Sequence, residues 1–229
     1  MLILAIDTAL DACAAAVLDS ETGKLIAQES QSMKRGHAEA LMPLIARVIA
    51  ASETAFTDLG RIAVTTGPGS FTGLRVGLSA ARGIGLAANI PVVGVTTLAA
   101  YAAPIVSQNA EHTVVSAIDA RHDHVYLQIV SGNGSALVRP CVIPIPEALD
   151  DWRYGAAHLV GNAAGILAER WPTNTVAPFN VDMQAAPDIS WVGWLGAAVD
   201  PNTAKARPFY LRAPDAKPQV ANVAPAPAP

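Results

Sequence analysis

The chain has 229 residues, enough for one large domain or for two lobes. Hydrophobic residues make up 52% of the sequence, so a substantial core can be buried and wholesale disorder is excluded. The 15 Lys and Arg residues against 19 Asp and Glu residues give a net charge of −4, which argues against a protein that holds nucleic acid through its overall charge.

Three features of the sequence indicate the compartment. Cys13 and Cys141 are far apart and form no Cys-x-x-Cys pair, which argues against a disulfide-stapled or zinc-ribbon fold and fits a reducing cytosol. No basic region precedes the first apolar run, which Asp7 ends, so we expect no export signal. The uncharged stretch 83–110 is broken by Gly, Asn and Pro residues, so we expect no membrane span. A cytoplasmic protein is therefore expected.

Short apolar runs open the sequence. Residues 2–7, 12–18 and 24–31 are predicted to be consecutive strands joined by tight turns. Apolar residues then recur at helical spacing over 37–51, a pattern that predicts a helix, and Pro43 is expected either to delay its start or to kink it.

Strands and helices alternate in the next segment. Residues 61–66 and 92–95 are predicted strands, and residues 74–88 form a predicted helix that follows a Gly-rich turn at 67–73. Another helix is expected from about Thr97. This order implies parallel pairing of strands with a right-handed crossover.

The composition changes in the second half. Strands are predicted at 113–118, 124–130 and near 136–143, with an Asn-Gly hairpin turn at 131–135. All four tryptophans fall in the fifty residues after 150, which suggests a second, smaller lobe beginning near residue 105. The Pro/Ala-rich tail 213–229 is predicted to be disordered, and no internal repeat is evident.

The Gly-rich turn is the most distinctive local motif. It reads Gly67-Pro68-Gly69-Ser70-Phe71-Thr72-Gly73 and lies where backbone N–H groups can face an anion. No Lys follows it, so it is not a Walker A loop, and its glycine spacing does not match a dinucleotide-binding fingerprint. Two interpretations remain: a tight turn, which the spacing favours, or a nucleotide-proximal loop containing Gly67, Gly69 and Ser70.

Other candidate groups are isolated. Asp7 and Thr8 end the first strand and either help to position a metal–nucleotide or cap a turn. Arg121 and Asp123 follow a later strand and read as a local charge pair. The five histidines form no His-x-x-x-His pair, and no nucleophile–base set is recognisable, so we expect no metal site and no catalytic residues.

Two helical patterns allow either a core or a partner-facing interpretation. One is the apolar stripe Leu41, Leu44, Ile45 and Val48. The other is a ridge of small residues spaced by four, from Gly73 through Gly77 and Ala81 to Gly85. Interior glycines cost about 0.5–1 kcal/mol each relative to Ala, so a close contact with a sheet or another helix should offset them.

The run from Thr65 to Gly83, which contains the Gly-rich turn, closely resembles the bacterial TsaB family, also called YeaZ. The segments Ile6-Asp7-Thr8, 37–45, 118–121 and 209–212 are similar to it too. The resemblance implies an α/β actin-like ATPase (ASKHA) fold of two ribonuclease H-like lobes with mixed sheets. It places an N-terminal lobe with partner-binding helices at 1–104 and a smaller C-terminal lobe at 105–212.

The resemblance also implies a role without catalysis. TsaB proteins support TsaD, a paralogue that transfers threonylcarbamoyl to the adenosine beside the anticodon of tRNAs that read ANN codons. We expect a heterodimer with TsaD, a TsaE-type ATPase in the ternary complex, a homodimer when alone, and only indirect contact with tRNA. No cofactor is expected on the isolated chain. In the complex, ATP or ADP is expected near the interface. The implied interface residues are Leu41, Leu44, Ile45, Val48, Arg75, Gly77, Leu78, Ala81, Arg82 and Gly85.

The metal ligands of TsaD have no counterpart here. Its paired histidines, four residues apart, align with Thr97 and Tyr101. A neutral hydroxyl is a poor replacement for imidazole at a transition-metal site. The resemblance and the ligand chemistry therefore both predict that this chain does not perform the transfer.

Two rival functions stay open. One is an active ATP-dependent enzyme of the same fold, with Asp7 and the Gly-rich turn as its phosphate and metal site. The other is a glycoprotease-like peptidase that acts on its partner, a label common in related families.

Overall fold

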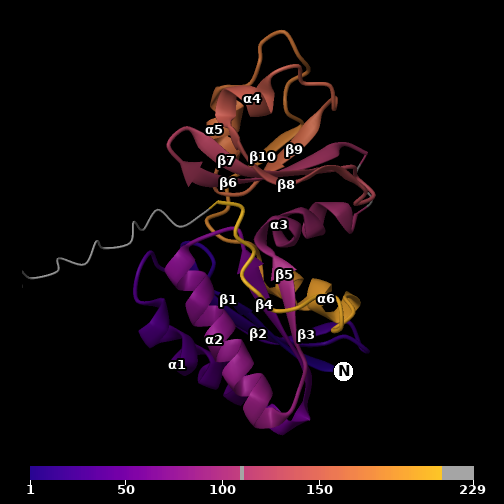
Figure 1. The fold of residues 1–229 in the computed structure, drawn as a ribbon. Helices are drawn as coiled ribbons and strands as arrows, with labels where there is room; N and C mark the ends of the chain where they lie inside the picture. The colour runs from indigo at the N-terminus through magenta and orange to yellow at the C-terminus, as the bar shows by residue number, and fades with distance from the viewer. Residues whose placement is uncertain (109–110, 213–229) are drawn as a thin grey trace, which may run out of the picture.

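The first sheet of the computed structural model contains five strands in the order β3-β2-β1-β4-β5 (Figure 1). The structure describes residues 1–108 and 111–212, so the predicted tail 213–229 lies outside the described residues. β1, β2 and β3 pair antiparallel, whereas β4 and β5 continue the sheet in parallel with β1. The strands are β1 (Leu2–Asp7), β2 (Ala12–Asp19), β3 (Lys24–Ser32), β4 (Leu59–Gly67) and β5 (Val92–Thr96).

The second sheet repeats this topology. Its order β8-β7-β6-β9-β10 has the same antiparallel and parallel pairings, with β6 in the central place of β1. Both central strands contain the tripeptide Ala-Ile-Asp, which ends β1 at Asp7 and reaches Asp119 two residues before the end of β6. The predicted actin-like architecture of two ribonuclease H-like lobes is confirmed. The strands are β6 (Thr113–Arg121), β7 (His124–Val130), β8 (Ala136–Pro144), β9 (Ala157–Val160) and β10 (Asn180–Asp182).

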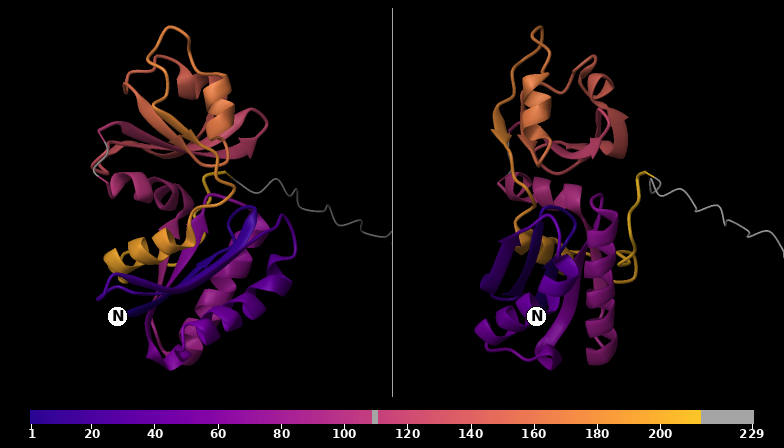
Figure 2. Two further views of the ribbon diagram at one scale, coloured as in Figure 1. Left: turned by 180° about the vertical axis from the view of Figure 1, so that it is seen from behind. Right: turned by 90° about the vertical axis from the view of Figure 1, so that its left-hand side faces the viewer.

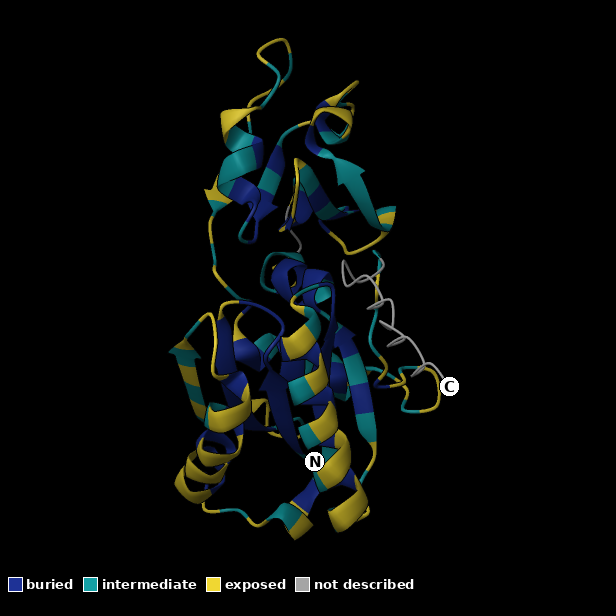
Figure 3. Cartoon of the chain, turned by 60° about the vertical axis from the view of Figure 1, so that its left-hand side comes forward, coloured by how far each residue is buried: buried dark blue, intermediate teal, exposed yellow. Residues whose placement is uncertain are grey.

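Helices cover the outer face of each sheet. α1 (His37–Ala51) and α2 (Phe71–Ala88) pack side by side on the first sheet, and α4 (Ile145–Leu149) and α5 (Ala164–Glu169) pack on the second. The short 3-10 helix η1 (Phe56–Asp58) precedes β4. In Figure 3 the outward surfaces of α1 and α2 are exposed and their inner surfaces are buried.

The last helix of each lobe packs across the lobe boundary. α3 (Thr97–Val106) follows the first sheet but packs mainly on β6, while α6 (Ile189–Ala198) follows the second sheet and packs on β1, β2 and β4 (Figure 2). The guanidinium of Arg61 on β4 donates to the carbonyls of Gly196, Ala197 and Val199 at 2.8–3.0 Å and so caps α6. The prediction that residues 105–212 form the second lobe is wrong for α6, because this final helix belongs to the core of the first lobe.

Two helices differ from expectation, α2 in its start and α1 in the effect of Pro43. α2 begins at Phe71 rather than 74, because the Ser70 hydroxyl accepts the Gly73 N–H at 3.3 Å and caps the helix. α1 begins at His37 and continues through Pro43, whose side chain is exposed. Among the described residues, no helix combines the length and the apolar character that a bilayer crossing needs.

Candidate functional site

The lobes face one another across a cleft of about 520 Å³. Four turns at the ends of central strands line it: residues 9–11 after β1, 68–71 after β4, 118–121 at the end of β6, and Asn162 after β9. The two lobes contribute topologically equivalent turns. The charged residues in the lining are Asp11, Lys34, Asp119, Arg121 and Arg212.

Asp7 lies beneath this cleft rather than in its lining. It is fully buried, and one carboxylate oxygen accepts hydrogen bonds from the Thr65 hydroxyl at 2.5 Å and the Ala9 N–H at 2.9 Å. The second oxygen is buried without a hydrogen-bond partner. Burial raises the pKa of the Asp7 carboxyl, against the opposing effect of the Thr65 hydrogen bond. Of the two interpretations of Asp7, the structure agrees with the turn cap, because its carboxylate accepts the Ala9 N–H in the turn after β1.

The Gly-rich turn packs tightly on the turn after β1. Ser70 N–H donates to Ala9 O at 2.7 Å, and the Thr8 hydroxyl donates to Gly73 O at 2.7 Å. A Cβ added at Gly69 would lie 2.3 Å from Ala9 O, which explains the glycine there. The N–H groups of Ser70 and Gly73 are thus satisfied within the protein, and Pro68 has none.

Only part of the predicted nucleotide-proximal loop reaches the cleft. Gly69 and Ser70 line it, whereas Asp7, Thr8 and Gly67 are buried behind it. This arrangement agrees with the tight-turn interpretation, because the glycines serve backbone packing.

Thr97 and Tyr101 are both buried on α3. The Tyr101 hydroxyl donates to Gln184 O at 2.9 Å, and the Thr97 hydroxyl has no hydrogen-bond partner. Burial raises the pKa of the Tyr101 hydroxyl, and the nearby Asp7 charge acts in the same direction. Within the described part of the chain, no three His, Cys, Asp or Glu side chains are grouped so that they could hold a metal ion.

Most of the predicted interface residues lie in the core. Leu41, Leu44, Ile45, Val48, Gly77, Leu78, Ala81 and Gly85 are buried against the first sheet, and only Arg75 and Arg82 are exposed. A Cβ at Gly77 would lie 2.5 Å from the Thr8 hydroxyl oxygen, and one at Gly85 would lie 2.4 Å from a Val92 methyl. The stripe and the ridge therefore lie mainly on the inner surface of the two helices, although Leu41 also lines the groove described below.

The outer surface of the same helices holds a largely different set of residues, which shares Leu41 and Arg75 with the predicted interface. An apolar groove of about 520 Å³ runs between α1 and α2. Met42 is 48% exposed beside it, and Leu86 is 86% exposed near the end of α2. Sequence reasoning missed these positions because they flank the periodic stripe. The groove is lined by Ala38, Leu41, Met42, Phe71, Thr72, Arg75, Val76, Ser79 and Ala80.

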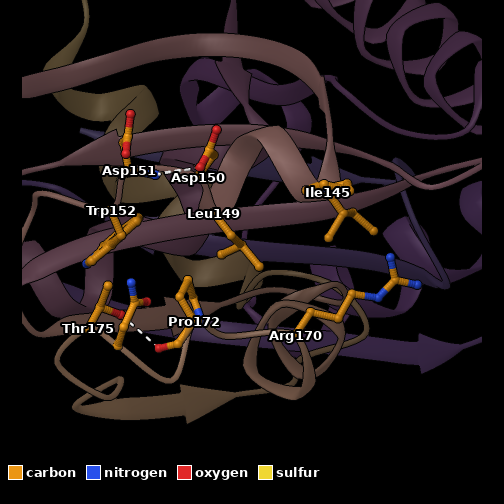
Figure 4. A pocket seen from close by; sticks show the side chains of 10 residues that line it. Ile145, Leu149, Asp150, Asp151, Trp152, Arg170, Pro172 and Thr175 are labelled. Atoms are coloured by element: carbon orange, nitrogen blue, oxygen red, sulfur yellow. Dashed lines mark hydrogen bonds between the residues drawn. The ribbon is translucent and has the colours of Figure 1, made fainter.

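A further pocket of about 640 Å³ lies on the second lobe (Figure 4). Ile145 and Leu149 of α4, Trp152 and Pro172 form much of its wall. Arg170 at its edge pairs with Asp123 outside the lining. No residue that the sequence singled out as a candidate site is among its lining residues.

Comparisons with known proteins return the related TsaD and TsaB proteins. The family model described as TsaD, tRNA N6-adenosine threonylcarbamoyltransferase, matches residues 24–193. The chain is 38% identical over 126 residues to the Escherichia coli tRNA threonylcarbamoyladenosine biosynthesis protein TsaB, a match covering 55% of this chain and 53% of that protein. It therefore spans about half the length of such curated relatives.

Two full-length similarities extend this result. An uncharacterized protein of Mycobacterium tuberculosis is 33% identical over 226 residues, which covers 94% of each chain. The solved structure of YeaZ from Pseudomonas aeruginosa superposes with a TM-score of 0.76 at 27% identity, covering 92% of this chain and 99% of that one. On these grounds, the chain belongs to the TsaB (YeaZ) family.

Proposed function

We propose that this chain is a non-catalytic subunit of the system that installs threonylcarbamoyl on the adenosine beside the anticodon of tRNA. The proposal rests above all on the exposed apolar groove between α1 and α2, which lies on the first lobe and shares Phe71 with the lining of the interlobe cleft. Such a surface suits helix-on-helix docking with a partner of the same fold. We propose TsaD as that partner, a second copy of this chain when TsaD is absent, and a TsaE-type ATPase as a further member of the complex.

The proposed interface differs from the one expected from sequence. Its apolar centre is formed by Met42, Val76 and Ala80, and Arg75 and Arg82 lie exposed on α2. The buried stripe beneath holds the two helices in register on the sheet. The chain would act by mass action, because binding only the competent form of TsaD raises the population of that form.

The interior of the cleft supports the non-catalytic part of the proposal. Asp7 is buried, the Gly-rich turn uses the N–H groups of Ser70 and Gly73 internally, and residues 209–212 of the chain itself line the cleft. These features count against the rival ATP-dependent enzyme. We propose that ATP or ADP associates near the complex interface, and that tRNA contact is indirect.

The interface is tested with two methionines that differ in location. Met42→Asp places a charge beside the groove, while Met183→Asp makes the same change at a residue that is 71% exposed on the second lobe. Titration calorimetry with purified TsaD should show at least about tenfold weaker binding for Met42→Asp and unchanged binding for Met183→Asp. Equal affinities for the two variants would refute the assignment of the groove.

The absence of catalysis is tested separately. The isolated chain, incubated with tRNA and an activated threonylcarbamoyl donor, should give no modified nucleoside by mass spectrometry. Adding the chain to TsaD and TsaE should raise the yield over TsaD and TsaE alone. Modification by the chain alone would show that it is an enzyme.

A further inference from the structure

The segment after α6 returns along the first lobe toward the cleft. Lys205 forms an antiparallel bridge with Val93 on β5, and Gly94 N–H donates to Ala204 O at 2.9 Å. The Arg82 guanidinium on α2 then donates to Ala206 O, its Nε at 3.1 Å. In Figure 2 this segment, coloured yellow, rises beside α2 to the level between the two lobes.

Residues 209–212, which follow this segment, are called the strap. Phe209 N–H donates to Thr66 O at 2.8 Å, so the strap is attached to β4 of the first lobe. The Arg212 guanidinium donates to Ala120 O at 3.2 Å, so it is also attached to β6 of the second lobe. All four strap residues line the interlobe cleft.

The strap also contacts the start of α2. The centroids of the Tyr210 and Phe71 rings lie 5.3 Å apart. The Arg75 guanidinium lies over the Phe71 ring, 3.9 Å from its centroid. Phe71 lines both the interlobe cleft and the α1–α2 groove. The strap therefore connects three places: β4, the cleft edge of the second lobe, and the first turn of α2.

We propose that the strap is a built-in clasp that holds the two lobes together across the interlobe cleft, so that their relative position needs no bound ligand. Its anchors lie in different lobes, so opening of the cleft requires release of the Phe209 or the Arg212 hydrogen bond. Because the strap belongs to the same chain, it rebinds at a high effective concentration, and weak individual contacts suffice to keep it in place. Release of the strap also removes Tyr210 from Phe71 and loosens the first turn of α2.

Hydrogen exchange on the full-length protein tests this proposal. The double variant Tyr210→Ala, Arg212→Ala removes the ring contact and the anchor on the second lobe. Arg207→Ala is the matched control, since Arg207 is an exposed arginine close by in the chain that does not line the cleft. Exchange is followed at the Phe209 amide and in peptides covering 66–72, 118–123 and 189–198.

The double variant should exchange at least about tenfold faster than wild type at Phe209, in 66–72 and in 118–123, with α6 (189–198) unchanged as evidence of an intact fold. The Arg207→Ala protein should match wild type throughout. Faster exchange confined to Phe209, with 118–123 unchanged, would show a local attachment and overturn the clasp. Unchanged exchange at all of these sites would overturn it as well. The measurement needs no TsaD, so it stands apart from the test of the partner interface.

Discussion

The Thr65 hydroxyl donates a 2.5 Å hydrogen bond to one oxygen of the Asp7 carboxyl, while the other oxygen is buried without a partner. A carboxylate in this position loses its hydration and gains compensation at only one oxygen. Folding therefore disfavours the charged carboxylate relative to the unfolded chain, and the pKa of Asp7 lies above its value in the unfolded chain.

This shift makes stability depend on pH. Because the pKa of Asp7 is raised in the folded protein, the contribution of Asp7 to the free energy of unfolding is fully present below the unfolded pKa of about 3.9. This contribution is lost as the pH rises through the pKa of Asp7 in the folded protein. Asp7→Asn mimics the neutral acid, and we expect it to raise the free energy of unfolding at pH 8 by about 1–3 kcal/mol. Urea unfolding at pH 5 and pH 8 measures this.

Asp119 provides the control for that variant. It occupies the equivalent position on β6, two residues before the end of that strand, but is exposed. Asp119→Asn should leave the difference in unfolding free energy between the two pH values as in wild type. A pH dependence of the Asp7→Asn protein identical to that of wild type would contradict the burial argument.

Two glycines of α2 should respond to alanine in opposite directions. A Cβ at Gly73 would lie 2.1 Å from Thr8 O, a backbone atom held within the turn, so Gly73→Ala should lower the free energy of unfolding by about 1–3 kcal/mol. A Cβ at Gly83 meets nothing within 4 Å, so Gly83→Ala should raise it by up to about 1 kcal/mol. Chemical denaturation of both variants measures these changes. If Gly83→Ala lowered the free energy of unfolding as much as Gly73→Ala, the difference in packing around the two glycines would be contradicted.

The Tyr101 hydroxyl joins α3 to the segment between β10 and α6. Its 2.9 Å hydrogen bond to Gln184 O is lost in Tyr101→Phe, which should lower the free energy of unfolding by about 1 kcal/mol. Tyr210→Phe keeps its ring against Phe71 and should have no measurable effect. Thermal unfolding of the two proteins side by side gives the comparison, and equal midpoints would argue against the Gln184 bond.

The two cysteines should react with thiol reagents at very different rates. Cys13 is fully buried on β2, and burial raises the pKa of its thiol to about 11. Cys141 lies half-buried on β8 at the edge of the second sheet. Mass spectrometry after brief alkylation of the native protein at pH 8 should find label on Cys141 first. Equal labelling of Cys13 without denaturant would contradict its burial.

Local patterns predicted the elements well but not how they are shared between lobes. The helical stripe of α1 and the alternation of strands with helices follow from period and turn residues, which are local properties. The packing of α6 on the first sheet depends on contacts such as Arg61 with Gly196, which are far apart in the sequence. A weak signal for the repeated lobe did exist, in the Ala-Ile-Asp tripeptide that β1 and β6 share.

The candidate site was harder to predict for a similar reason. Buried apolar stripes and glycine ridges mark the inner surface of a helix, so they drew attention to residues that a partner cannot reach. The groove residues Ala38, Ser79 and Ala80 are small or polar and have no period of their own. The position of the strap at the cleft could not be predicted, because it depends on the contact of Phe209 with Thr66, which are distant in sequence.

The exchange of α3 and α6 between the lobes has a consequence for any attempt to divide this protein. A fragment cut between residues 104 and 105 would leave the first sheet without α6 and the second without most of its contact to α3, so each piece would present a bare apolar surface to water. Neither half is an autonomous folding unit, and the two pieces should regain structure only when mixed. The intact chain should accordingly melt in one cooperative step.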